Sequence, residues 1–204
     1  MITLVDYGLG NIQAFANIYK RLNIPVRTAS SAAELAGADK LILPGVGAFD
    51  WAMTLLNESG MRERLEELVV GRGCPVLGVC VGMQMMAKRS DEGELAGLGW
   101  IDAEVRKFDE TAFTQKTHLP HMGWNDVAPK NNACLFQGLK EGWRFYFLHS
   151  YYFVPNRESD VLAVTDYNGL FASSVRSGNV FGVQFHPEKS HHWGIQLLKN
   201  FAEL

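Results

Sequence analysis

The feature that most constrains the fold is the regular alternation of short apolar runs with segments of helical periodicity in the first half of the chain. The apolar runs are candidate strands and cover residues 2–6, 25–29, 40–43 and 75–79. The helical segments lie between them, and the clearest is residues 12–22, where apolar residues recur every three or four positions. Strands that alternate with helices pair in parallel and are covered on both faces. The pattern therefore predicts an α/β fold, a doubly wound and mostly parallel sheet with helices on both faces.

The remaining helices and strands are predicted from the same periodicities. We expect a short helix from Ser30-Ser31 to Leu35, two helical stretches broken at Ser59-Gly60, and a helix over residues 83–88. From about Trp100 onward the patterns change, with candidate strands at residues 143–148, 161–165 and 180–185 and a closing helix at 193–202. We therefore expect an additional β-rich segment in the C-terminal half. A length of 204 residues without a repeat or linker predicts one domain, residues 1–204.

Composition narrows the classes of function. Hydrophobic residues make up 47% of the chain, charged residues 20%, and the formal net charge is −3. This balance favours neither nucleic acid nor an anionic membrane as a partner. The first residues lack the features of a signal peptide or a membrane span. Three cysteines without paired spacing argue against a disulfide framework. We expect a soluble, cytoplasmic protein.

A cysteine at the end of a predicted strand is the first candidate for chemistry. The run Gly78-Val79-Cys80-Val81-Gly82 follows an apolar strand and precedes a predicted helix. Gly-x-Cys-x-Gly repeats the arrangement of the nucleophile elbow, where a sharp turn exposes the nucleophile above a sheet. A helix N-terminus also favours the reactive thiolate. The alternative is a buried, inert cysteine, which is our interpretation of Cys74 and Cys134.

A second strand end supplies a candidate base. His186 follows an apolar run, and Pro187 stiffens its link to Glu188. A cysteine nucleophile needs a base, and a carboxylate that orients the base completes a triad. The alternative is a loop histidine beside a solvated glutamate. The other histidines lack metal-ligand spacing, so we expect no metal site.

A third strand end is rich in glycine. The segment Pro44-Gly45-Val46-Gly47 is suited to turning a backbone N–H group into a pocket, where it stabilises an oxyanion. The competing interpretation is a phosphate-binding loop. It is weaker because the Walker pattern is missing and Gly8-Leu9-Gly10 lacks a third glycine at dinucleotide spacing.

Together these motifs resemble the class I glutamine amidotransferases. The resemblance extends to Pro120-His121-Met122-Gly123-Trp124-Asn125 and His149-Ser150-Tyr151, and it is strongest to the HisH family of glutaminase subunits. It implies a flavodoxin-like fold, no cofactor, and a triad of Cys80, His186 and Glu188. It further implies an oxyanion site at backbone N–H groups of Gly45, Val46 and Val81. Glutamine would be held by Gln84, Glu92, Ser150 and Tyr151.

The resemblance also implies a partner. In HisH proteins the glutaminase passes ammonia to HisF, a (β/α)8-barrel synthase of histidine biosynthesis. We expect Pro120, Met122, Gly123, Trp124 and Asn125 at that interface; the alternative for Trp124 is an ordinary core aromatic. Three further hypotheses stay open: ammonia supply to a sugar amidotransferase of surface-polysaccharide synthesis, a non-catalytic regulatory subunit, and a cysteine peptidase or related hydrolase.

Overall fold

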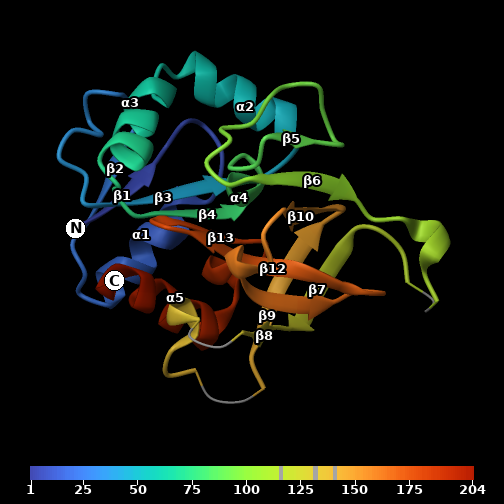
Figure 1. The fold of residues 1–204 in the computed structure, drawn as a ribbon. Helices are drawn as coiled ribbons and strands as arrows, with labels where there is room; N and C mark the ends of the chain where they lie inside the picture. Colours follow the sequence, from blue (N-terminus) through green and yellow to red (C-terminus); the bar gives the residue numbers. More distant parts are fainter. Residues whose placement is uncertain (115–116, 131–132, 140–141) are drawn as a thin grey trace.

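A parallel sheet forms the centre of the protein (Figure 1). The computed structural model describes residues 1–114, 117–130, 133–139 and 142–204. The parallel strands lie in the order β2-β1-β3-β4-β13. Their bounds are β1 (Ile2–Val5), β2 (Val26–Ala29), β3 (Lys40–Gly45), β4 (Val76–Cys80) and β13 (Val180–Val183). This is the 2-1-3-4-5 order of flavodoxin-like folds, in which ligands bind beyond the carboxyl ends of the strands.

Further strands extend this sheet beyond β13 and confirm the expected β-rich segment; all of their pairings are antiparallel except that of β5 with β6. The order continues β12-β10-β6-β5, and β11 pairs with both β12 and β8. These strands are β5 (Arg89–Ser90), β6 (Ala103–Lys107), β8 (Ala128–Pro129), β10 (Tyr151–Pro155), β11 (Val161–Asp166) and β12 (Leu170–Ser177). A separate two-stranded sheet joins β7 (His121–Asp126) to β9 (Arg144–His149).

Helices cover both faces of the parallel sheet, which confirms the predicted fold class. Helices α1 (Ile12–Arg21) and α5 (His191–Glu203) lie below the sheet in Figure 1, and α2 (Phe49–Glu58) and α3 (Arg62–Glu66) lie above it. The hydroxyl of Tyr19 in α1 donates to the carbonyl of Leu198 in α5 at 3.2 Å. This bond joins the first and last helices of the chain.

Two predicted helices are wrong, because the backbone in both places forms hydrogen bonds other than those of a continuous α-helix. Near Leu35 the chain forms turns, in which the amide of Ala36 donates to the carbonyl of Ala33 and the amide of Ala38 donates to the carbonyl of Leu35. Gly37, with φ 69°, leaves the helical conformation at this point. The helix predicted over residues 83–88 is only the single turn α4 (Val81–Gln84). The next carbonyls, of residues 85–87, accept instead from amides of the returning segment 98–101.

The second helical stretch after Ser59-Gly60 also differs from a regular α-helix. It begins as α3 and continues as a π-helical turn, η1 (Glu67–Gly71). The wider turn keeps Leu68 and Val69 buried against the core. The other predicted helices and strands agree with the structure to within one or two residues at most ends.

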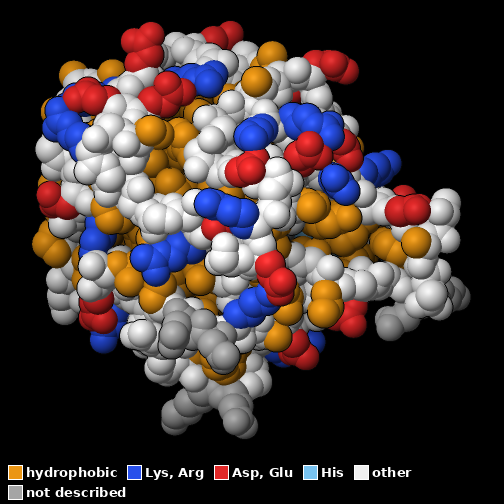
Figure 2. All heavy atoms as spheres, viewed as in Figure 1, with side chains coloured by type: hydrophobic (Ala, Val, Ile, Leu, Met, Phe, Trp, Pro, Cys, Tyr) orange, Lys and Arg blue, Asp and Glu red, His pale blue; other side chains and the backbone are white. Residues whose placement is uncertain are grey.

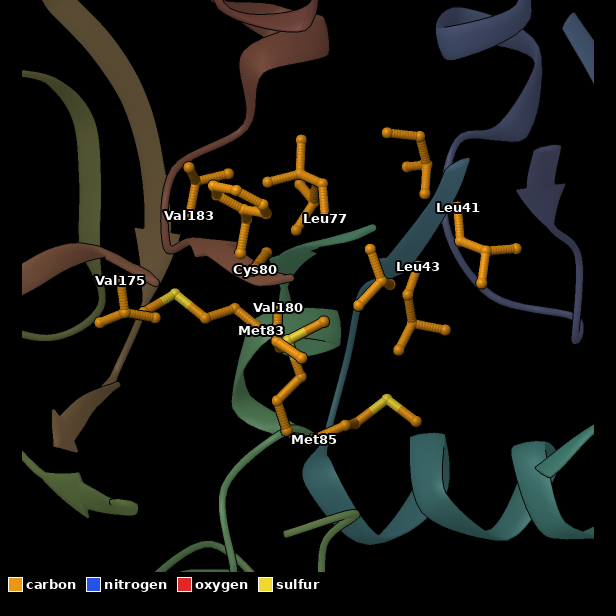
Figure 3. Packing of buried hydrophobic residues seen from close by; sticks show 14 of the residues in the cluster. Leu41, Leu43, Leu77, Cys80, Met83, Met85, Val175, Val180 and Val183 are labelled. Atoms are coloured by element: carbon orange, nitrogen blue, oxygen red, sulfur yellow. The ribbon is translucent and has the colours of Figure 1, made fainter. Parts of the chain in front are cut away.

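The hydrophobic core includes buried side chains from every parallel strand and from the helices on both faces. Figure 3 shows Cys80 among apolar side chains of these strands, including Leu43, Leu77 and Val183, all of them buried. The surface in Figure 2 mixes basic and acidic side chains over the face that is shown. Within the described ranges, no helix combines the length and apolarity required to cross a bilayer.

Glycines allow α4 to lie directly against β3 and β4. A Cβ atom on Gly82 would stand 2.0 Å from the carbonyl oxygen of Leu43, and one on Gly78 would stand 2.7 Å from the carbonyl oxygen of Gly82. A Cβ atom on Gly45 would stand 2.5 Å from the amide nitrogen of Gly82. Because every one of these obstacles is backbone, the elbow after β4 requires glycine at all three positions.

We predict that Gly82→Ala lowers the free energy of unfolding by about 3 kcal/mol, because the added methyl group forces α4 away from β3. Gly71→Ala is the matched control, since a Cβ atom at Gly71 would meet nothing within 4 Å. The control should change stability by less than about 1 kcal/mol. Urea denaturation measures both variants, and equal stabilities would contradict the predicted close approach.

Candidate active site

A pocket of about 320 Å³ opens beyond the carboxyl ends of β3, β4 and β13. This volume lies at the lower end of the roughly 300–1,000 Å³ typical of small-molecule sites. The structure brings nine of the predicted site residues to its wall: Val46, Cys80, Val81, Gln84, Glu92, Pro120, Ser150, Tyr151 and His186. Four further lining residues were given no role at the site from the sequence: Gly47, Leu148, His149 and Lys189.

Cys80 stands on a strained turn at the end of β4. Its backbone has φ 55° and ψ −114°, a conformation that L-residues rarely adopt. Such strain is typical of a nucleophile elbow, where the surrounding packing holds the residue in place. Cys80 is buried, and its sulfur borders the pocket.

His186 is held by the segment that follows β13. Its Nδ1 lies 2.9 Å from Oε1 of Glu188, and both side chains are buried. Ser190 clamps this segment, because its hydroxyl donates to the carbonyl of His186 at 2.6 Å and accepts from the amide of Tyr146 at 3.0 Å. The imidazole therefore faces the pocket with one nitrogen already bound to a carboxylate.

Two opposing effects set the charge of His186. Burial disfavours the imidazolium, but hydrogen bonds and charge interactions with Cys80 and Glu188 outweigh it and raise the pKa of His186 above its ordinary value. A buried carboxylate, an imidazole and a thiol thus form one hydrogen-bonded group. The raised pKa favours the imidazolium form of His186 next to the sulfur of Cys80. Glu188 lies behind His186 and is not part of the pocket wall.

A buried amide network supports the nucleophile. The Nε2 atom of Gln84 donates to Oε1 of Gln184 and to the carbonyl of Tyr151, each at 3.1 Å. Gln184 in turn places its own Nε2 3.9 Å from the sulfur of Cys80. The sequence analysis assigns no role to Gln184, because a single glutamine inside an apolar run carries no distinctive pattern.

The pocket wall also carries an acidic group. Glu92 accepts a hydrogen bond from the amide of Phe49 at 2.9 Å, at the first residue of α2. Burial raises the pKa of Glu92, the bond from Phe49 opposes that shift, and the charge of Asp50 adds to it. Ser150 and Tyr151 line the same pocket from the start of β10. A carboxylate and backbone groups in one pocket can bind the ammonium group and the carboxylate group of an amino acid.

The glycine-rich segment after β3 forms the pocket wall next to Cys80. Val46 and Gly47 line the pocket, and Gly47 has φ 92°. Gly45 does not line it, because that residue belongs to β3 and packs against α4. Val81 is the first residue of α4, so its amide has no acceptor within the helix.

Four of the five predicted partner-binding residues lie on β7. The fifth, Pro120, precedes this strand and lines the pocket, so the rim that the five residues form lies next to the pocket. Exposure alternates along this strand, and the outward side chains of Met122 and Trp124 are 65% and 37% exposed. Pro120, which follows a cis peptide bond, belongs to both the pocket and this rim. The alternative that Trp124 is a core aromatic is wrong. Gly123 and Asn125 are half-buried on the other face of β7.

Two further histidines are buried beside the pocket. Nδ1 of His121 lies 2.9 Å from Nε2 of His149. Burial lowers the pKa of His121 to about 4. The pKa of His149 falls to about 3, because burial and the charges of His121 and His186 outweigh its bond to Tyr151. Both imidazoles are therefore neutral near pH 7. Across the part of the chain that is described, no three His, Cys, Asp or Glu residues form a metal-binding group.

Comparison with known proteins is consistent with this geometry. The family model "Glutamine amidotransferase class-I" matches residues 3–204. The HisH subunit of imidazole glycerol phosphate synthase from Bdellovibrio bacteriovorus is 59% identical over 204 residues, and the alignment covers 100% of both chains. The HisH subunit from Leptospira interrogans is 48% identical with the same coverage.

Solved structures share the fold at low identity. A crystal structure of a glutamine amidotransferase superposes with a TM-score of 0.74 at 23% identity, over 100% of this chain and 99% of that chain. The structure of PurLQS from Thermotoga maritima gives 0.70 at 16% identity, over 99% and 97%. At such identities these matches show the fold alone.

The matching family model and the full-length relatives show that the chain belongs to the class I glutamine amidotransferases. Within that class it belongs to the HisH family. The family predicted from the sequence motifs is confirmed, and so is the expectation of a glutamine amidotransferase. The hypotheses of a non-catalytic subunit and of a cysteine peptidase are accordingly set aside.

We predict that the free energy of unfolding decreases as the pH falls from about 6.5 to 5. His121 and His149 bind protons less tightly in the folded chain than in the unfolded chain, where their pKa is about 6.5. Below that pH the unfolded chain takes up more protons, so stability is lost, by roughly 1–3 kcal/mol. Urea denaturation at pH 7 and pH 5 measures the loss.

The control for this prediction is His121→Phe, which removes one of the two titrating groups while keeping a ring. That variant should lose less stability between pH 7 and pH 5 than the wild-type protein. An equal loss in both proteins would contradict the assignment to the histidine pair.

Proposed function

We propose that this chain is the glutaminase subunit of an imidazole glycerol phosphate synthase. In this role it hydrolyses glutamine to glutamate and ammonia and delivers the ammonia to a HisF-type synthase. The observation that carries the proposal is the buried Cys80–His186–Glu188 group at the carboxyl ends of β4 and β13. The full-length HisH relatives support the choice of pathway.

The first half of the reaction forms a thioester. His186 takes the thiol proton, and the sulfur of Cys80 attacks the side-chain amide carbon of glutamine. The C–N bond then breaks, and His186 returns its proton to the leaving amine, which departs as ammonia. Glu188 keeps the imidazole oriented through the 2.9 Å bond to Nδ1 and stabilises its positive charge.

The second half releases glutamate. His186 takes a proton from water, the oxygen attacks the thioester carbon, and Cys80 leaves with its proton restored. Both halves develop charge on the former amide oxygen. The amide of Val81 and an amide of the Gly45-Val46 segment are the proposed donors to this oxygen. No cofactor or metal takes part in these steps.

The other end of glutamine meets the wall opposite the nucleophile. Gln84, Ser150 and Tyr151 hold the amino-acid end, and Glu92 pairs with the ammonium group. All four residues line the pocket with Cys80. Contacts at the amino-acid end place the side-chain amide carbon next to the sulfur of Cys80. A longer or shorter side chain would place that carbon elsewhere, so these contacts select glutamine.

The exposed rim of β7 is the proposed docking face for the synthase. Met122 and Trp124 present apolar surface beside the pocket mouth, and Leu148 adds a side chain that is 39% exposed. An apolar rim around the mouth excludes water when covered, so ammonia can pass to the partner without becoming ammonium. Pro120 lies at the pocket end of this strip, and Gly123 and Asn125 support it from the half-buried face of β7.

We predict that the purified chain releases glutamate from glutamine, and that a HisF-type synthase with its nucleotide ligand strongly stimulates the release. Stimulation arises because docking covers the pocket and orders the oxyanion segment. The assay measures glutamate with and without the partner. If the synthase leaves the rate unchanged and a sugar amidotransferase from the same organism stimulates it, the assignment to histidine biosynthesis is overturned. The assignment of glutaminase activity would stand.

The control for the chemistry is Cys80→Ser, which keeps the shape of the site and replaces the nucleophile. Glutamate release should fall by at least about 10³-fold, while the melting temperature stays near that of the wild type. Turnover close to that of the wild-type protein would contradict the thioester mechanism.

We predict that Trp124→Ala weakens binding of the synthase by about 10–30-fold, because it removes an exposed aromatic anchor from the rim. Trp51→Ala is the matched control, since Trp51 is 54% exposed on α2 and does not line the pocket. Titration calorimetry compares the dissociation constants. Equal affinities for the two variants would place the interface elsewhere.

A further inference from the structure

A chain of hydrogen bonds runs from the proposed docking strand to the substrate wall through two buried histidines. His121 of β7 and His149 of β9 face each other in register, and Nδ1 of His121 lies 2.9 Å from Nε2 of His149. At one end, Nδ1 of His149 lies 2.8 Å from the carbonyl oxygen of Tyr151. At the other end, Nε2 of His121 lies 3.1 Å from Nδ2 of Asn125.

The direction of every bond in this chain follows from its two ends. The carbonyl of Tyr151 can only accept, so Nδ1 of His149 carries a hydrogen and its Nε2 accepts from His121. Nδ1 of His121 therefore carries the other hydrogen. Its Nε2 accepts from Asn125, whose Nδ2 also donates to the carbonyl of Asp166 at 2.9 Å. Two backbone carbonyls thus determine both tautomers and the orientation of the amide.

The chain stays intact only while both rings are neutral. A proton added to either imidazole would place two donors opposite each other in a buried space. Burial prevents this near neutral pH, since it lowers the pKa of both rings by more than two units. His121 is also packed between Phe147 and Tyr167, with ring centroids 4.6 and 4.0 Å away, so the ring has no room to rotate.

The accepting carbonyl belongs to the segment that faces the substrate. Tyr151 lines the pocket next to Ser150, and its carbonyl receives a second bond from Nε2 of Gln84 at 3.1 Å. The carbonyl is therefore held from two sides, by His149 from β9 and by Gln84 from α4. If either His149 or Gln84 stops donating, the carbonyl of Tyr151 keeps only one hydrogen bond.

We propose that His121 and His149 are positioning residues, which fix the Ser150-Tyr151 segment against the amino-acid end of glutamine. The proposal rests on the proposed function. Asn125 extends the same chain of bonds to β7, so the strand that meets the partner and the wall that meets the substrate belong to one rigid hydrogen-bonded unit. None of these bonds involves the reacting atoms, so their effect falls on substrate binding.

The test compares His121→Phe with wild-type protein in the complex with the synthase. Phenylalanine keeps the stacked ring and removes the hydrogen bonds of His121 to His149 and to Asn125. We therefore expect KM for glutamine to rise about 10-fold, while kcat changes less than about two-fold. His121→Asn keeps a donor close to the position of Nδ1, and its KM should return to within about three-fold of the wild-type value. His118→Phe is the matched control, since His118 is exposed three residues away.

A second readout separates substrate positioning from the nucleophile. Alkylation of Cys80 by iodoacetamide needs only the thiolate, so His121→Phe should react at the wild-type rate. Labelling by a diazoketone analogue of glutamine also requires that the Ser150-Tyr151 segment bind the amino-acid end of the analogue. In His121→Phe this labelling should slow by about 10-fold. An unchanged KM together with an unchanged labelling rate would overturn the proposal.

A spectroscopic measurement tests the chain without any variant. Nitrogen-15 NMR of the histidine side chains should show His121 and His149 as neutral rings with hydrogen on Nδ1. Hydrogen on Nε2 of either ring would overturn the proposal. A wild-type complex that neither hydrolyses glutamine nor reacts with the diazoketone would instead overturn the proposed function, whatever the NMR spectrum shows.

Discussion

The close backbone contact between α4 and β3 is the constraint on which the rest of the site depends. Gly82 leaves no space for a Cβ atom beside the carbonyl of Leu43, and Gly45 and Gly78 meet backbone in the same way. This contact forces the turn at Cys80 into its positive-φ conformation and presents the sulfur to the pocket. The glycine-rich segment after β3 lies beside the nucleophile for the same reason. Close packing of main chain thus replaces side-chain contacts at the point where chemistry is expected.

Around that point the protein uses two kinds of polar interaction. In the Cys80–His186–Glu188 group, hydrogen bonds and charge interactions with its two partners offset the cost of burying a positively charged His186. The surrounding amides and the His121–His149 pair are neutral, and carbonyls at their ends determine their direction. Neutral hydrogen-bond networks hold the surrounding side chains in position and add no further charge next to Cys80. The site therefore separates reactive groups from supporting groups by their electrostatic character.

Much of the fold and the catalytic group could be predicted, because both depend on local patterns. Apolar runs locate the parallel strands, and glycines two residues either side of Cys80 signal the elbow. The failures have tertiary causes. The helix expected after Gln84 stops after one turn because a later segment takes its carbonyls, at Met85, Met86 and Ala87. Leu148, His149 and Lys189 join the pocket through strand pairing and a bridge between Tyr146 and His186, which no local pattern encodes.

By itself the sequence determined the class of fold and the family, and it located Cys80 as the candidate nucleophile, since these follow from periodicity and from short motifs whose spacing has a steric reason. Only the tertiary structure decided which distant residues meet. His121 looked like a histidine without a partner, yet pairing of β7 with β9 places it 2.9 Å from His149 and joins both to the substrate wall. Hydrogen-bond direction depends on which groups stand opposite each other in space. That information arises only when strands far apart in the chain come into register.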